Sequence, residues 1–258
     1  MKNNDFLKNY IQLQTDIMYQ EVIETEAATI PLCNIYDSSF FNYAQVDKLI
    51  SEEQLEEIES ILKQKNRMPA LYFENREDLQ ILKNFLSDKG YQQSWEDSWM
   101  FHDGQDIDPT RFDQVKKVAN DQDLEVFQTT FDSCYQEKDP QNPYGTLGDY
   151  LKTSERAWID HHKTNRVEYF IVYKKNTPVA VASLTNFANI GYISNVGSLR
   201  SVRGEGFGKV ASLYCVVKSF QNQNQVTALA TEDGDYPNEF YTRIGFETKF
   251  SAVGYTKQ

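Results

Sequence analysis

The sequence predicts an α/β (α+β) fold in which helices flank a mixed sheet. Three observations support this class. Strand-like and helix-like segments alternate from residue 41 to the end of the chain. Residues 167–184 hold two runs rich in β-branched and aromatic residues around a turn, which is typical of an antiparallel hairpin. A glycine-rich loop at residues 203–208 then joins a strand-like segment to a helical one.

The first hundred residues are expected to form a smaller α/β half. Ser51 and Gln54 have the spacing of a capping box, and an apolar helical stripe starts at Leu55. A second amphipathic helix covers residues 79–86, and Gly90 follows it as the C-terminal glycine. The strands predicted around these helices cover residues 41–50, 69–73 and 92–102.

The second half is expected to be a larger α/β unit. An apolar helical face centred on Phe127 precedes a loop at residues 136–148, and a helix follows at residues 150–163. Near the C-terminus, Pro237 and Gly245 bracket a short helix. The strands predicted in this half cover residues 112–118, 167–173, 179–184, 190–196, 225–230 and 249–255.

The length of the chain, 258 residues, suggests one large or two small domains at roughly 150 residues each. The polar stretch at residues 103–109 is the expected linker. We therefore predict an accessory α/β domain at residues 1–108 and a second domain at residues 109–258.

Composition limits the partners of the protein. A net charge of −12 argues against nucleic acid and fits a cationic substrate such as an amine, although it also serves solubility. No run approaches 18 apolar residues, so no membrane span is expected, and residues 1–8 contain no apolar run, so no secretory signal is expected. Cys33, Cys134 and Cys215 have neither disulfide nor zinc spacing, so we expect a cytoplasmic protein without a metal site. The oligomeric state stays open.

The loop at residues 203–208 has the properties of a phosphate-binding turn. Glycines let the backbone approach an anion closely, and the start of the following helix adds partial positive charge. A tight turn without a ligand would look similar. A Walker loop is excluded, because Lys209 is followed by Val210 rather than Ser or Thr. A dinucleotide-binding turn fits residues 206–211, with Glu232 as the distant acid, but only about fifty residues follow, too few for further βα units.

Two segments together resemble the signatures of the GNAT N-acetyltransferase family. Residues 203–208 are similar to the family motif Arg/Gln-x-x-Gly-x-Gly/Ala, which follows its fourth strand, and residues 240–246 are similar to its Leu-Tyr-x-x-x-Gly-Phe segment. Order and spacing agree over about residues 112–258. One departure is that residues 199–202 lack the proline or acid often found there. The resemblance implies a mixed, mainly antiparallel twisted sheet flanked by helices.

The resemblance also implies a site for acetyl-CoA. The glycine loop would hold the pyrophosphate through main-chain N–H groups, and the end of the preceding strand would pair with the pantetheine arm like an added strand. Tyr241 would face the cofactor sulfur as the catalytic residue. The implied cofactor-binding residues are Asn195, Val196, Gly197, Ser198, Arg203, Gly204, Glu205, Gly206, Phe207 and Gly208.

The implied reaction is direct attack of a primary amine on the thioester of acetyl-CoA. The amine would belong to a small molecule or a peptide. An alkyl amine with a pKa of about 10 must first lose a proton. Glu232 and Asp233 are the candidates for the base, and the alternative, which the sequence favours, is a solvated acidic loop. The phenol of Tyr241 stays protonated at pH 7 and can donate to the departing thiolate. Residues 135–150 are expected to shape the acceptor pocket.

Alternatives remain at this point. A non-catalytic acyl-CoA-binding or sensing module would keep the glycine loop and need no acid. The first half could be a degenerate GNAT-like half, because residues 70–91 echo residues 228–246 in their order of strand, helix and glycine. Any α/β unit would show a similar echo. Residues 46–51, where a phosphate loop would lie, contain no glycine.

Overall fold

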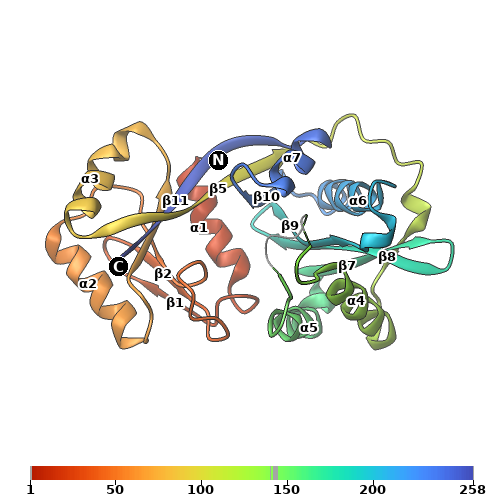
Figure 1. Ribbon diagram of the computed structural model, residues 1–258, viewed down its shortest axis with the longest axis horizontal. Helices are drawn as coiled ribbons and strands as arrows, with labels where there is room; N and C mark the ends of the chain where they lie inside the picture. The colour runs from red at the N-terminus through yellow and green to blue at the C-terminus, as the bar shows by residue number, and fades with distance from the viewer. Residues whose placement is uncertain (1, 140, 142–144, 258) are drawn as a thin grey trace. The chain divides into compact units, whose positions relative to one another are not determined.

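The computed structural model describes residues 2–139, 141 and 145–257, which fold into two compact units (Figure 1). Unit 1 contains the chain up to residue 99, residues 230–238 and the chain from residue 248 on. Unit 2 contains residues 100–229 and 239–247. The domain division at residues 1–108 and 109–258 stays a prediction.

Unit 1 is built on a sheet with helices on its faces. Its elements are α1 Asn3–Gln14, β1 Glu21–Glu24, β2 Thr29–Leu32, β3 Ala44–Gln45, α2 Glu52–Gln64, β4 Ala70–Glu74, η1 Glu77–Leu79, α3 Gln80–Asp88, most of β5 Tyr91–His102 and most of β11 Glu247–Lys257. The strand order is β1-β2-β3-β4-β11-β5. Strands β3 and β4 are parallel, whereas β1 with β2, β2 with β3, and β4 with β11 are antiparallel.

The two faces of this sheet carry different side chains. Leu71 and Phe73 of β4 belong to the apolar core that α2 and α3 cover. Tyr72 lies on the other face, where its hydroxyl accepts a hydrogen bond from the indole of Trp99 at 2.9 Å. Phe6 of α1 packs edge-on against the same indole. The alternation of side chains along β4 therefore separates the apolar core under α2 and α3 from the aromatic cluster beside α1.

Local signals in the first half are confirmed, and one strand is shorter than predicted. The capping box of Ser51 and Gln54 is present, and Gly90 ends α3 with a φ of +85°. The strand predicted over residues 41–50 is wrong in extent, because only Ala44 and Gln45 form β3. The side chain of Asn42 accepts from the N–H of Cys33 and donates to two loop carbonyls, which holds the chain before β3 in a loop.

Unit 2 contains the predicted hairpin in the middle of its sheet. Its elements are η2 Phe112–Gln114, β6 Val115–Lys117, α4 Asp121–Cys134, α5 Tyr150–His161, η3 His162–Thr164, β7 Val167–Lys174, β8 Thr177–Phe187, β9 Ile190–Ser198, η4 Arg200–Val202, α6 Phe207–Gln221, the first part of β10 Val226–Glu232 and the second part of α7 Tyr236–Arg243. The strand order is β10-β9-β8-β7-β6, and every pair is antiparallel except β10 with β9.

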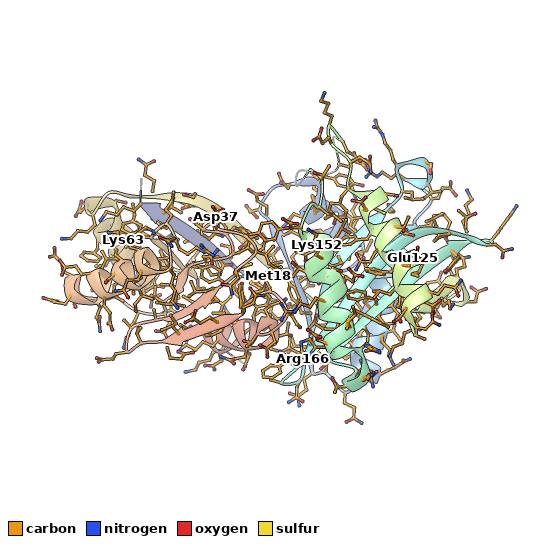
Figure 2. All side chains as sticks on the ribbon, turned by 90° about the horizontal axis from the view of Figure 1, so that it is seen from below. Met18, Asp37, Lys63, Glu125, Lys152 and Arg166 are labelled. Carbon is orange, nitrogen blue, oxygen red and sulfur yellow. The ribbon has the colours of Figure 1, made fainter. Side chains whose placement is uncertain are left out.

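Helices cover both faces of this sheet. Helix α6 lies on one face, and α4 and α5 lie on the other (Figure 1). Figure 2 shows Glu125 on α4 and Lys152 on α5, with the strands behind them. The mixed, mainly antiparallel sheet expected from the sequence is confirmed. Within the described residues, no helix combines the length and the apolar character that a membrane span needs.

Candidate functional site

The glycine loop leads directly into α6. Gly204 and Gly206 both have a φ of +83°, a conformation that glycine adopts without strain. Gly206 is the N-cap residue of α6, and it offers no side chain to cap the helix. The N–H of Val210 is bonded to the carbonyl of Gly206 at 3.0 Å, and the N–H groups before it have no partner within the helix. Donors and partial positive charge therefore converge at the predicted pyrophosphate loop.

Gly208 brings the loop close to two other elements of unit 2. A Cβ added at Gly208 would lie 3.6 Å from Cζ of Phe240 on α7 and 3.9 Å from Oγ of Ser198 at the end of β9. A Cβ added at Gly204 would meet nothing within 4 Å, so that glycine faces open space. The backbone at Gly208 thus lies where the end of β9 and the start of α6 approach each other.

Strand β9 contains a bulge just before the loop. Val181 and Ser183 of β8 are two positions apart, but their partners Gly197 and Ser194 on β9 are three positions apart. Asn195 accommodates the extra residue with a φ of +53°. Such a bulge bends a strand and changes the direction in which the following residues point. The pairing of β9 with β10 involves residues 190–192, which lie before the bulge.

The backbone direction after the bulge follows from one hydrogen bond. The N–H of Leu199 donates to the carbonyl of Val179 on β8 at 2.9 Å. The N–H and C=O groups of successive residues point to opposite edges of a strand. Because those of Leu199 face β8, those of Val196 and Ser198 point toward the edge that faces away from β8. An extended ligand could pair with this edge as an added strand.

The side chain of Asn195 is held from α5. Its Oδ1 accepts a hydrogen bond from the hydroxyl of Tyr150 at 2.8 Å. From the sequence, Tyr150 was expected only to end the acceptor loop and begin a helix. The two residues are 45 positions apart, so no local signal could have paired them.

Arg203 does not extend freely from the loop. Its Nη1 donates to Oδ1 of Asp139 at 2.5 Å, and the Asp139 side chain is only 1% exposed. This guanidinium is the main reason why the pKa of Asp139 lies below its ordinary value. Asp139 was not predicted as a site residue, and its loop neighbours Pro140, Pro143 and Tyr144 lie outside the described residues.

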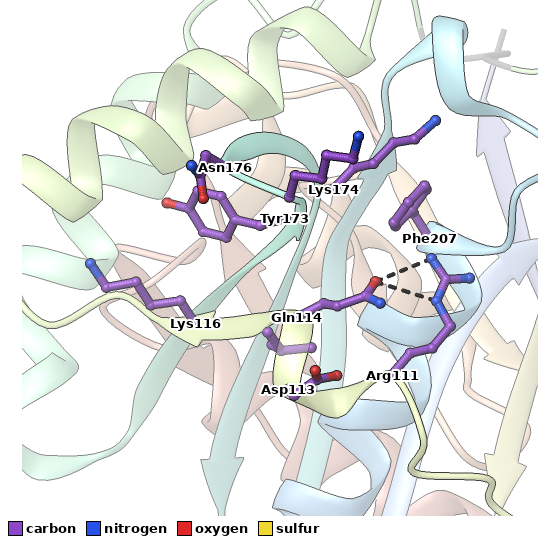
Figure 3. Close-up of a pocket in the computed structure, with 10 residues that line it drawn as sticks. Arg111, Asp113, Gln114, Lys116, Tyr173, Lys174, Asn176 and Phe207 are labelled. Carbon is purple, nitrogen blue, oxygen red and sulfur yellow. Dashed lines mark hydrogen bonds between the residues drawn. The ribbon is translucent and has the colours of Figure 1, made fainter.

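Glu205 and Phe207 are held from the β7 side of the loop. The carboxylate of Glu205 forms an ion pair with Lys174 at 2.7 Å. The guanidinium of Arg111 donates to the Glu205 carbonyl at 2.7 Å and lies 4.4 Å from the ring centre of Phe207. These contacts border a cavity of about 730 Å³ (Figure 3). Its cations are Arg111, Lys116, Lys174 and Lys175.

Tyr241 is buried on α7, in the same unit as the loop. Its side chain belongs to the core of unit 2, with ring centres 5.0 Å from Phe240 and 5.4 Å from Phe246. Gly245 ends this helix with a φ of +101°, which allows the N–H of Phe246 to donate to the carbonyl of Tyr241 at 3.0 Å. Tyr241 directly follows Phe240, the residue of α7 that lies beside Gly208, and its catalytic role remains a prediction.

The predicted base candidates lie in unit 1. Oδ1 of Asp233 accepts a hydrogen bond from Ser98 at 2.6 Å, and Glu232 is exposed at the end of β10. A third carboxyl group lies beside them: Asp97 is buried and accepts from the hydroxyl of Tyr72 at 2.8 Å. Burial first, and then the negative charge of Glu232, raise the pKa of Asp97 to about 7. Only a strand was predicted at Asp97 from the sequence.

Comparison with known proteins supports the sequence resemblance. Residues 126–246 match the model of the acetyltransferase (GNAT) family. This stretch includes the bulge, the glycine loop and Tyr241. Residues 126–246 are a GNAT acetyltransferase domain. No curated protein matches the chain in sequence.

Solved structures extend the likeness of fold beyond the GNAT domain. A GCN5-related N-acetyltransferase from Kribbella flavida has a TM-score of 0.68 at 19% identity, covering 97% of this chain and 94% of that one. A GCN5-related N-acetyltransferase from Sphaerobacter thermophilus has a TM-score of 0.62 at 10% identity, covering 98% and 84%. A tandem GNAT protein from the clavulanic acid biosynthesis pathway has a TM-score of 0.56 at 12% identity, covering 99% and 87%. At these identities the likeness concerns the fold.

Proposed function

We propose that the protein is an N-acetyltransferase that moves an acetyl group from acetyl-CoA to a primary amine by direct attack. The observation that carries this proposal is the start of α6 inside the GNAT domain. Two glycines with positive φ lead to helix N–H groups that no side chain caps, beside the bulged edge of β9. Family membership of residues 126–246 supports acyl transfer in general.

The loop fits a pyrophosphate in shape and in charge. Its acidic side chain, Glu205, would repel phosphate, but Lys174 holds that carboxylate in an ion pair on the β7 side. Gly208 has no Cβ at the point of closest approach between α6 and β9. In this proposal, residues 203–208 bind the pyrophosphate, and residues 195–198 pair with the pantetheine arm through the edge that faces away from β8.

The acceptor nitrogen loses two protons in the reaction, and the leaving thiolate gains one. The amine nitrogen forms a bond to the acetyl carbonyl carbon, the carbon–sulfur bond breaks, and the thiolate leaves. In our proposal the hydroxyl of Tyr241 donates a proton to that thiolate, because a phenol remains protonated at pH 7. The ammonium form of the acceptor loses one proton to a base before it attacks. The nitrogen loses a second proton as the amide forms, and this proton restores the phenol of Tyr241.

A non-catalytic acyl-CoA-binding module is the alternative. One observation favours it: Tyr241 is 9% exposed and packed between two aromatic rings, as a purely structural residue would be. The two functions differ in turnover. The test is a panel of primary amines incubated with acetyl-CoA, with release of free thiol as the signal. Thiol release that depends on an amine supports the enzyme, whereas acetyl-CoA binding without release for any amine supports the module.

For the first half we propose a degenerate GNAT-like half. Strand β4, helix α3 and strand β5 repeat the order of β10, α7 and β11, and both helices end at a glycine with positive φ, Gly90 and Gly245. The likeness in fold to a tandem GNAT protein over 99% of the chain also supports this proposal. The first half of this chain has no glycine loop at residues 46–51, so in this proposal only the second half binds the cofactor.

The proposed location is the cytoplasm. Cys33, Cys134 and Cys215 are all buried free thiols, which suits a reducing compartment. The proposed acceptor is a small molecule or a peptide with a primary amine, in keeping with the net charge of −12.

A further inference from the structure

The first observation concerns Tyr135, the residue directly after α4. Its hydroxyl donates a hydrogen bond to the carbonyl of Val196 at 2.9 Å. A Cβ added at Gly197 would lie 3.2 Å from Cε2 of Tyr135, so the ring rests against β9. The carbonyl of Val196 points to the edge that faces away from β8. Tyr135 therefore occupies an acceptor that an added strand would need.

The second observation concerns Asp139, four residues further along. Its Oδ1 holds the guanidinium of Arg203, the first residue of the glycine loop. Its Oδ2 is buried and has no hydrogen-bond partner among the described residues. A carboxylate oxygen without a partner makes a buried ion pair less favourable than it would be if fully bonded. Asp139 therefore holds Arg203 through one of its two carboxylate oxygens, and an incoming anion would compete with it for the guanidinium.

The two contacts match the two ends of the proposed cofactor site. A hydroxyl donates where an amide N–H of the pantetheine arm would donate, and a carboxylate accepts where a phosphate would accept. Both groups come from one short stretch, residues 135–139, which we call the α4 extension. The residues they contact, Val196 and Arg203, were assigned to the cofactor on separate grounds.

We infer that the α4 extension occupies the cofactor site in the free protein, and that acetyl-CoA binds by displacing Tyr135 from Val196 and Asp139 from Arg203. This inference rests on the proposed function, because it assumes that acetyl-CoA binds along β9 and the glycine loop. The observed affinity is the affinity of the open site multiplied by the fraction of molecules in which the extension has left the site. Tyr135 and Asp139 thus set the affinity for the cofactor without touching it in the complex.

The inference predicts that removing either contact tightens binding. Asp139→Asn should lower the Kd for acetyl-CoA by about three- to tenfold, and Tyr135→Phe by about two- to fivefold, since a neutral hydrogen bond is the weaker of the two contacts. Isothermal titration calorimetry of the full chain measures both values. Asp160→Asn is the matched control, because it removes a carboxylate paired with Arg156 on α5 and should leave the Kd unchanged.

Two fragments of the cofactor test the Asp139 and Tyr135 contacts one at a time. Inorganic pyrophosphate, in competition with acetyl-CoA, should bind more tightly to Asp139→Asn and equally well to Tyr135→Phe. Pantetheine should show the opposite pattern. Melting curves without ligand establish that each variant is folded, and if one variant fails to fold, the other still tests its own contact.

The outcomes distinguish this inference from the proposed function. If the wild type binds acetyl-CoA and both variants bind with the same or a weaker Kd, the inference is overturned while the proposed function stands. A weaker Kd for Asp139→Asn would mean that Asp139 orients Arg203 toward the cofactor. If neither the wild type nor the variants bind acetyl-CoA, both fail.

Discussion

The starts of helices α2 and α6 differ in how their first N–H groups are satisfied. At α2, Oγ of Ser51 accepts from the N–H of Gln54 at 3.3 Å, and the side chain of Gln54 accepts from the N–H of Ser51 at 3.0 Å. At α6 the N-cap residue is Gly206, which has no side chain. Helix α2 closes its own end, whereas α6 leaves donors and the positive end of its dipole for an anion. The start of α6 is therefore open to the proposed anion, whereas the start of α2 is closed by its own side chains.

The largest effect is expected from a negative charge at the start of α6. Gly208→Asp should abolish measurable acetyl-CoA binding, because its carboxylate would stand in the place of the pyrophosphate and repel it. The fold should survive, since the added Cβ would make an ordinary contact of 3.6 Å with Phe240. Calorimetric titration measures binding, and a melting curve checks the fold. Gly206→Asp should also abolish binding, but its φ of +83° adds backbone strain.

Gly90→Asp is the control for this change in the other half. Its φ of +85° makes any side chain strained by about 1–2 kcal/mol, so the variant should melt at a lower temperature. Its Kd for acetyl-CoA should equal that of the wild type. Normal acetyl-CoA binding by Gly208→Asp would show that the start of α6 is only a tight turn.

Tyr241→Phe should lower kcat by about 10²–10⁴-fold, with little change in the affinity for acetyl-CoA. The hydroxyl acts only as the thiolate leaves, so its loss affects the transition state alone. The ring keeps its packing against Phe240 and Phe246. Steady-state kinetics with an amine found in the panel provide the measurement. A kcat within about twofold of the wild type would remove Tyr241 from the mechanism.

The buried carboxyl group of Asp97 should make the stability of the protein depend on pH. Its pKa of about 7 in the folded state lies above the ordinary value of 3.8, so between these values the folded state keeps a proton that the unfolded state has lost. The free energy of unfolding should therefore fall as pH rises from about 4 to 7. Asp97→Asn should remove about 2–4 kcal/mol of this fall. Urea denaturation at pH 5 and pH 8 measures it.

The result for Asp97→Asn distinguishes a structural role of this carboxyl group from a functional one. A flatter pH dependence of stability with normal turnover would mean that unit 1 satisfies its polar groups internally, as α2 does at its start. If Asp97→Asn leaves the pH dependence of stability unchanged and abolishes turnover, unit 1 holds a functional carboxyl group.

The smallest effect is expected at the capped helix. Ser51→Ala should lower the free energy of unfolding by about 1 kcal/mol, because it removes the acceptor for the N–H of Gln54. The Kd for acetyl-CoA should not change. Chemical denaturation and calorimetry together provide the check. A change in acetyl-CoA affinity at Ser51→Ala would contradict the assignment of α2 as a helix start without a ligand.

Much of the fold was predictable because its signals are local. The capping box at Ser51, the terminal glycines Gly90 and Gly245, and the β7–β8 hairpin each depend on residues close together in the chain. The first forty residues contain α1, β1 and β2, for which no element was predicted. Helix α1 lacks a side-chain cap, and β1 and β2 have four residues each, so their signals are weak.

The site was predictable only as far as its motifs reach. The loop at residues 203–208 and Tyr241 came from a family resemblance over short segments. The pairs Asp139 with Arg203 and Tyr150 with Asn195 join residues 64 and 45 positions apart, so they depend on how α4 and α5 pack against the sheet. The shifted pKa of Asp97 likewise arises from burial, which its own neighbours in sequence do not specify.

The measurement that tests the central claim most directly is a thermal melting series with acetyl-CoA and with NAD. The account predicts that acetyl-CoA at a hundredfold excess over its Kd stabilises the protein by about 2.7 kcal/mol. NAD at the same concentrations should leave the melting curve unchanged, because the start of α6 belongs to a GNAT domain and not to a dinucleotide-binding unit. A melting curve that saturating acetyl-CoA does not shift would contradict the account.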